Sequence, residues 1–189
     1  MIAPRIAVIL DENTSADGTT YEANKNYFQA LAAQGARAYG IPYARDMAES
    51  ILHDFDGYLS IGAGIAFPAS WYSAPVGSPF KQSERLDIDC ALMQAFLAAN
   101  KPVLGICHGM QQLAALCDSK LRGDLSGTVH DGGAHEITLQ PGTLLHTIIG
   151  QQSLTVNSRH KEAVHTLGPG VVASAAAPDG VIEAIELPG

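Results

Sequence analysis

The residue best suited to chemistry is Cys107, which lies in the run Gly-Ile-Cys-His-Gly-Met-Gln at residues 105–111. An apolar, β-prone stretch ends at Gly105, the cysteine follows two residues later, and Gly109 precedes residues with helical spacing. This pattern predicts a nucleophile elbow, a sharp turn between a strand and a helix. Glycines let the backbone turn, and the unpaired amides at a helix start favour a thiolate and can hold an oxyanion. We therefore expect Cys107 to act as a nucleophile in acyl chemistry.

The other two cysteines, Cys90 and Cys117, lie in helix-like patterns without flanking glycines. Buried free cysteines commonly behave as small apolar side chains, so we interpret both as packing residues. An odd number of cysteines without paired spacing argues against a disulfide framework. It favours a reducing compartment, and we expect a cytoplasmic protein.

The elements that would position Cys107 alternate along the first half of the chain. Strand-like runs occupy 6–10, 36–41 and 57–61, and helix-like patterns occupy 21–34, 44–52 and 83–100. This alternation predicts an α/β fold with a mostly parallel sheet that carries helices on both faces. Ligands of such sheets bind beyond the carboxyl ends of the strands, where Cys107 and the Gly-Ala-Gly run at 62–64 both fall.

The second half of the chain changes to a β-rich texture. Proline and glycine turns separate short strand-like pieces at 128–130, 135–139, 154–157, 171–175 and 181–186. A segment at 65–82, rich in proline and aromatic residues, is expected to be a long surface excursion. Because no linker interrupts the pattern, we expect residues 1–189 to form a single domain.

The composition limits the classes of partner. The chain has 189 residues, of which 47% are hydrophobic, so it can bury one sizeable core. Its first residues resemble a buried strand more than a signal peptide, and no apolar run approaches membrane-spanning length. A formal net charge of −8 argues against nucleic-acid binding. A small-molecule or peptide substrate is expected, with neither a nucleic acid nor a membrane as partner.

Four segments together resemble the class I glutamine amidotransferase superfamily, and within it the γ-glutamyl hydrolase-like branch, peptidase family C26. These segments are 105–111, 56–64, 156–160 and 177–184. The last two look particularly like enzymes that hydrolyse γ-glutamyl-γ-aminobutyrate. The resemblance implies a flavodoxin-like three-layer α/β sandwich with a C-terminal β-rich portion. It also implies cleavage of a γ-glutamyl amide through a cysteinyl thioester, without a cofactor.

The resemblance also implies roles for individual residues. Cys107 matches the nucleophile. The backbone amide of His108 and that of Gly64, or of a neighbour in the Gly62 loop, would form the oxyanion hole. Two amides from different loops that converge on one oxygen are what acyl transfer requires.

Gly62 itself is expected to contact the substrate, and further matches lie outside the elbow and the Gly62 loop. Gln111 matches a family glutamine that holds the glutamyl end of the substrate. Asn157 and Ser158 fall in a segment that resembles one contacting the same amino-acid head. His160, at the end of that segment, is expected to be a base or a substrate contact.

The chain departs from the family at the catalytic base. The family's histidine and glutamate, held in a His-Pro-Glu motif on a further strand, have no counterpart in this sequence, which ends at Gly189. A thiol with an ordinary pKa of about 8.5 benefits from a paired base. Three explanations are open. The sequence is a piece of a longer enzyme; or another histidine acts as the base, with His160 first and then His108 and His135; or the protein has lost hydrolysis.

Two other functions are considered. Cysteine followed by histidine and glycine also resembles the elbow of the DJ-1/PfpI superfamily, in which His108 would be the base of a small peptidase, chaperone or aldehyde-handling protein. A catalytically impaired binding or regulatory homologue is the other alternative. An incomplete sheet would leave an exposed strand edge, so a homodimer or a complex with a partner chain is expected.

Metal chemistry finds little support in the sequence. His130, His135, His160 and His165 are numerous, but their spacing matches no recognised ligand pattern and no cysteine pair accompanies them. We therefore expect no metal site.

Overall fold

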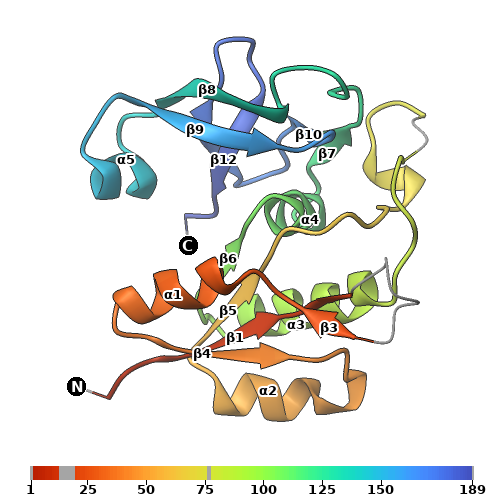
Figure 1. Cartoon of the computed structure of the whole chain (residues 1–189), viewed down its shortest axis with the longest axis vertical. Helices are drawn as coiled ribbons and strands as arrows, with labels where there is room; N and C mark the ends of the chain where they lie inside the picture. Colours follow the sequence, from red (N-terminus) through yellow and green to blue (C-terminus); the bar gives the residue numbers. More distant parts are fainter. Residues whose placement is uncertain (1, 13–19, 76–77, 189) are drawn as a thin grey trace. The chain divides into compact units, whose positions relative to one another are not determined.

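The computed structural model describes residues 2–12, 20–75 and 78–188, and the chain folds as two compact units (Figure 1). Unit 1 comprises Met1–Ala66 and Phe80–Gly109, and unit 2 comprises Phe67–Pro79 and Met110–Gly189. Residues 76–77 of the expected 65–82 excursion lie outside the described residues. No linker separates the units, because one boundary falls within a helix and the other two fall in the excursion.

Unit 1 contains a four-stranded parallel sheet. Its order is β4 (Arg37–Ile41), β1 (Arg5–Ile9), β5 (Gly57–Ser60) and β6 (Val103–Gly105). Helix α1 (Lys25–Ala33) covers one face, while α2 (Ala48–Asp54) and α3 (Arg85–Ala98) pack together on the other (Figure 1). This is the predicted flavodoxin-like arrangement of a parallel sheet between two helical layers.

Apolar residues in the central strands and in α3 form the core of unit 1. Ala7, Val8 and Ile9 of β1 are fully buried, as expected for a parallel strand covered on both faces. The ring of Phe96 on α3 lies 5.4 Å from that of Tyr58 on β5. This packing fixes the strand ends from which the Gly62 loop and the elbow emerge.

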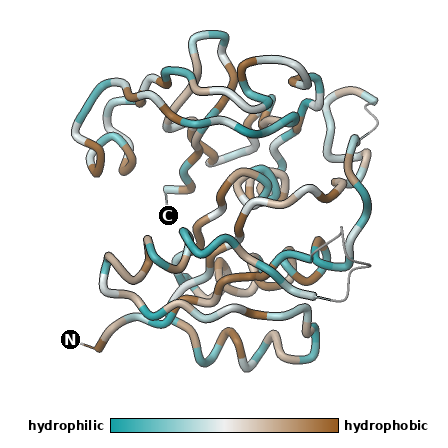
Figure 2. Tube along the Cα trace, in the orientation of Figure 1, coloured by the Kyte–Doolittle hydropathy of each residue, from teal (hydrophilic) through white to brown (hydrophobic). Residues whose placement is uncertain are grey.

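Unit 2 contains a six-stranded antiparallel sheet, which confirms the predicted β-rich portion. Its order is β7 (Lys120–Arg122), β10 (Ala163–Thr166), β12 (Ile182–Glu186), β11 (Val172–Ala176), β8 (Asp131–Leu139) and β9 (Ser153–Arg159). Ile137, Leu139 and Ala175 form one of its apolar clusters. Helix α5 (Leu144–Ile149) is strongly coloured as hydrophobic in Figure 2, and its Leu144 and Ile148 are exposed.

Some predicted elements were wrong. Residues 128–130 form a turn, because Thr128 bonds back to the Leu125 carbonyl through its hydroxyl and its amide instead of pairing with a strand. The helix expected from residue 21 begins at Lys25, since β3 (Tyr21–Glu22) pairs with β2 (Asp11–Glu12). The described residues also include two short 3-10 helices, Arg45–Met47 and Ala69–Trp71. No helix within the described ranges is long and apolar enough to cross a bilayer.

Candidate active site

Cys107 lies between strand β6 and helix α4 (His108–Leu116). Its φ angle of 53° places it in the left-handed region, which is uncommon for a residue other than glycine. Strained backbone of this kind occurs at nucleophile elbows, where it exposes the reactive atom above the sheet. The local geometry is thus the strand, turn and helix that the sequence predicts.

The two glycines nearest to this turn serve close packing. A Cβ on Gly109 would lie 2.4 Å from the Ser60 carbonyl oxygen, so only glycine lets the first turn of α4 approach β5. A Cβ on Gly62 would lie 3.5 Å from the Cβ of Cys107, so the Gly62 loop lies directly against Cys107. Gly64 follows in the same irregular loop, beside the ring of Phe80. The sharp turn is made by Cys107 itself rather than by the flanking glycines.

A buried charged network supports the base of the Gly62 loop. The fully buried Arg85 on α3 donates to the Ile61 carbonyl at 2.6 Å, directly before Gly62. Arg85 also faces Asp89, which accepts hydrogen bonds from Tyr58 and Ser60 at 2.7 Å each. Sequence reasoning missed this network, although an arginine and an aspartate four residues apart in an apolar helix were a signal for it.

His108 is buried and directly follows Cys107 in the chain. Burial and the Arg85 guanidinium lower the pKa of His108 to about 3. An imidazole with so low a pKa is neutral at physiological pH and is a weak base for accepting the proton of a thiol.

Glu162 lies where three of the sequence-predicted segments meet in unit 2. Its carbonyl oxygen accepts hydrogen bonds from the side-chain amide of the buried Gln111 and from Nδ1 of His160. Its carboxylate accepts hydrogen bonds from Tyr72 at 2.6 Å and Ser78 at 3.2 Å. Burial raises the pKa of Glu162, although these two hydroxyls oppose the shift. The side-chain amide of Gln111, expected to hold substrate, therefore bonds within the protein.

The predicted substrate segment is divided between the two faces of β9. Asn157 is exposed, whereas Ser158 is buried and donates to the His130 carbonyl at 3.0 Å. The backbone amide of His160 donates to the same carbonyl at 2.8 Å. Ser158 and His160 are thus joined to His130, a residue to which the sequence assigned no role.

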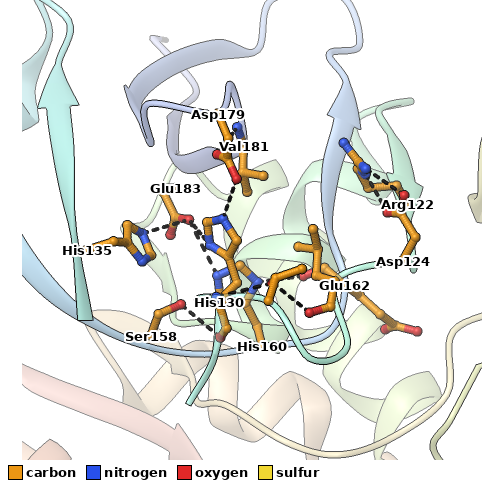
Figure 3. A network of polar contacts seen from close by, with 12 residues as sticks. Arg122, Asp124, His130, His135, Ser158, His160, Glu162, Asp179, Val181 and Glu183 are labelled. Carbon is orange, nitrogen blue, oxygen red and sulfur yellow. Dashed lines mark hydrogen bonds and ion pairs between the residues drawn. The ribbon is translucent and has the colours of Figure 1, made fainter. Parts of the chain in front are cut away.

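Three histidines gather around one carboxylate in unit 2 (Figure 3). The Oε1 atom of Glu183 lies 3.0 Å from Nδ1 of His130, 3.2 Å from Nε2 of His135 and 3.5 Å from Nε2 of His160. His130 is fully buried and the other three are largely buried. None of the four facing atoms is aligned for a hydrogen bond among the described residues. We call these four residues the histidine cluster.

In His130 and His160, the ring nitrogen that points away from Glu183 contacts another acceptor. His130 Nε2 lies 2.9 Å from Oδ2 of Asp179, and His160 Nδ1 lies 2.9 Å from the Glu162 carbonyl oxygen. Burial raises the pKa of Glu183, but the three imidazoles outweigh it and the pKa falls below its ordinary value. Burial lowers the pKa of His160, but Glu183 and the Glu162 carbonyl outweigh it and the pKa rises.

Comparison with known families identifies the chain. The sequence profile of the Peptidase C26 family matches residues 4–189. The chain belongs to the Peptidase C26 family. This C26 chain is 26% identical to a γ-glutamyl-γ-aminobutyrate hydrolase of Escherichia coli O157:H7, over 97% of this chain and 80% of that relative. The family resemblance predicted from the four sequence segments is confirmed.

Other relatives support the same family and fold. The C26 chain is 28% identical to protein NtpR of Enterococcus hirae over 74% of its length, and it spans 63% of that relative. A glutamine amidotransferase structure from Thermotoga maritima superposes with a TM-score of 0.68 at 14% identity, covering 98% of this chain and 72% of that one. At such identity the structural likeness establishes the fold alone.

Proposed function

We propose that this C26 chain is a cysteine-dependent hydrolase of γ-glutamyl amides, with Cys107 as its nucleophile. The observation that carries the proposal is the left-handed backbone of Cys107 between β6 and α4, with the Gly62 loop against its side chain. Membership of the C26 family and similarity to a γ-glutamyl-γ-aminobutyrate hydrolase support the choice of a γ-glutamyl substrate.

The proposed reaction has two stages. The Cys107 thiolate attacks the γ-carbonyl carbon, and the amides of His108 and Gly64 stabilise the oxyanion. Collapse of this intermediate breaks the carbon–nitrogen bond, and the amine leaves with a proton taken from water. Water then attacks the thioester, which releases glutamate and restores the thiol.

We propose that the amides at the start of α4 favour the Cys107 thiolate. The low pKa of His108 makes it a weak base, and this also weighs against a DJ-1-like role. Both ring nitrogens of His160, the first candidate from sequence, face acceptors within unit 2. We therefore expect rapid covalent labelling of the thiol.

Active-site labelling tests this proposal. A glutamine-like chloroketone or diazoketone should modify the wild-type protein at Cys107, as located by peptide mass spectrometry. Cys107→Ser should abolish the modification, and the matched variant Cys90→Ser should keep it. Absence of labelling under conditions that modify a related amidotransferase would contradict the proposal. Labelling without any release of amine is the result expected both of an impaired binding homologue and of a piece of a longer enzyme that lacks its base.

We also propose that two copies associate through the edge of the unit 1 sheet. Within the described residues β6 pairs with β5 alone, and Leu104 on β6 is 57% exposed. Unpaired strand edges pair readily with another chain. Light scattering should give the mass of a dimer for the wild type and of a monomer for Leu104→Lys; a wild-type monomer at all concentrations would contradict this proposal.

A further inference from the structure

The histidine cluster has the composition and spacing of a metal site. We propose that His130, His135, His160 and Glu183 bind a divalent transition-metal ion, with Zn²⁺ as the ion that this set fits best. The donor atoms of His130, His135 and Glu183 already lie within 4.8 Å of one another, and His160 Nε2 approaches the same Glu183 oxygen.

The outer hydrogen bonds determine which ring nitrogens face Glu183 with a lone pair. A carboxylate and a carbonyl can only accept, so His130 donates from Nε2 to Asp179 and His160 donates from Nδ1 to Glu162. The neutral forms of both rings therefore direct a lone pair toward the cluster. At 3.0 Å and 3.5 Å, these lone pairs face the anionic oxygen of Glu183. Such an arrangement is repulsive unless a ring proton or a metal cation lies between the nitrogen and the carboxylate oxygen.

The distances agree with three ligands, His130, His135 and Glu183, that share one small ion, and His160 Nε2 would move toward the other two nitrogens to complete the set. Zinc lies about 2.0–2.1 Å from nitrogen or oxygen ligands, and in a tetrahedron such ligands are roughly 3.3 Å apart. The three nitrogen-to-oxygen distances in the cluster are 3.0, 3.2 and 3.5 Å. Imidazole nitrogens suit zinc and its neighbours in the transition series, whereas magnesium and calcium prefer oxygen ligands. The donor set thus selects against the two abundant alkaline-earth ions.

The surroundings of the cluster also match those of a metal centre. Metal-bound histidines usually donate their second ring nitrogen to a carboxylate or a backbone carbonyl, which fixes the ring. Asp179 and the Glu162 carbonyl do this for His130 and His160. A divalent ion would also balance the charges of Glu183 and Asp179 beside three neutral imidazoles.

With His160 bound as the fourth ligand, the set would leave no open position, which is typical of a structural site. The ligands come from the turn before β8, from β8 itself, from the end of β9 and from β12. We therefore assign the ion a stabilising role in unit 2, where it would join segments that are distant in sequence. This inference does not rest on the proposed function, but it removes His160 from the candidate bases.

Metal titration of the purified, chelator-treated protein tests the inference. Isothermal titration with Zn²⁺ should show one site per chain. Co²⁺ should give the visible absorption of a tetrahedral nitrogen and oxygen site, without a thiolate charge-transfer band. His135→Gln and Glu183→Gln should weaken Zn²⁺ binding by more than about 100-fold, and Asp179→Asn, which only holds a ligand, by about 10–100-fold.

Matched variants separate this site from adventitious binding. His165→Gln makes the same change at an exposed histidine of unit 2 and should bind Zn²⁺ like the wild type. Cys107→Ala should also bind normally, because the proposed ligands include no thiol. Circular dichroism of each metal-free variant verifies that it folds. No stoichiometric binding by the wild type, or equal binding by His135→Gln, Glu183→Gln and His165→Gln, would overturn the inference.

Discussion

The two units hold their reactive groups in different ways. In unit 1, one backbone turn presents one thiol, Gly109 lets that turn approach the neighbouring strand, and a buried arginine supports the adjacent Gly62 loop. In unit 2, side chains from four separate segments converge on one carboxylate oxygen. In a parallel sheet the carboxyl ends of the strands lie together at one edge, and loops there form the site. In the antiparallel sheet of unit 2, the polar side chains come together through their contacts with one another.

This difference has consequences for mutation. The elbow depends on backbone conformation, so it tolerates a changed side chain at position 107 but not a methyl group at Gly109. The histidine cluster depends on side chains, so each substitution should alter it while the backbone persists. The predictions below test this contrast.

The largest effects should come from two variants, each of which removes the candidate site of one unit and leaves that of the other unit intact. Cys107→Ala should abolish amide hydrolysis, a loss of at least about 1000-fold, and leave Zn²⁺ affinity unchanged. His135→Gln should do the reverse: it should lose Zn²⁺ affinity and retain labelling of Cys107. Hydrolysis assays, calorimetry and mass spectrometry on both variants measure the four outcomes. Loss of labelling in folded His135→Gln would show that the two sites depend on each other.

Gly109→Ala should destabilise the protein by about 2–3 kcal/mol, as overpacking of a tight backbone contact does. The added Cβ would lie 2.4 Å from the Ser60 carbonyl oxygen, and main-chain atoms there cannot yield. Urea denaturation measures the loss. The matched variant Gly64→Ala places its Cβ 3.4 Å from the flexible ring of Phe80, so its stability should stay near that of the wild type.

Acid should lower the free energy of unfolding because of the buried His108. Its pKa falls to about 3 in the folded state, below the ordinary value of 6.5, so the unfolded chain takes up the proton first. The resulting decrease in the free energy of unfolding begins as the pH falls through about 6.5. It reaches about 2 kcal/mol by pH 5 and stops growing near pH 3. Denaturation at pH 7 and pH 5 should show a smaller loss for His108→Gln than for the wild type. An equal loss in both proteins would contradict this assignment; His165→Gln is the control.

Cys107→Gly should stabilise the protein by about 0.5–1 kcal/mol, because glycine adopts a φ of 53° without strain. Cys90→Gly, inside helix α3, should instead destabilise it by about 1 kcal/mol. Thermal or urea unfolding of the two variants measures the opposite signs. A loss of stability in Cys107→Gly would show that the thiol contributes more through packing than the turn costs in strain.

The elbow could be predicted from the sequence because its parts are adjacent in the chain. The strand, Cys107 and α4 occupy 14 residues, from 103 to 116, and local patterns describe them well. The histidine cluster could not be predicted, since His130, His135, His160 and Glu183 approach only through the pairing of β8, β9, β11 and β12. The pair Arg85 and Asp89 on α3 was a local signal of the buried network, but its partners on β5 and at Ile61 could not be read from the sequence.

The path of the chain between the units limits the order in which they can fold during synthesis. It passes from one unit to the other three times, at 66–67, 79–80 and 109–110. The segment Phe67–Pro79 is synthesised early. The hydroxyl of Tyr72 nevertheless donates its hydrogen bond to Glu162, which is synthesised 90 residues later. Unit 2 therefore cannot finish folding until most of the chain has been synthesised. No single cleavage of the chain would release either unit as one continuous fragment.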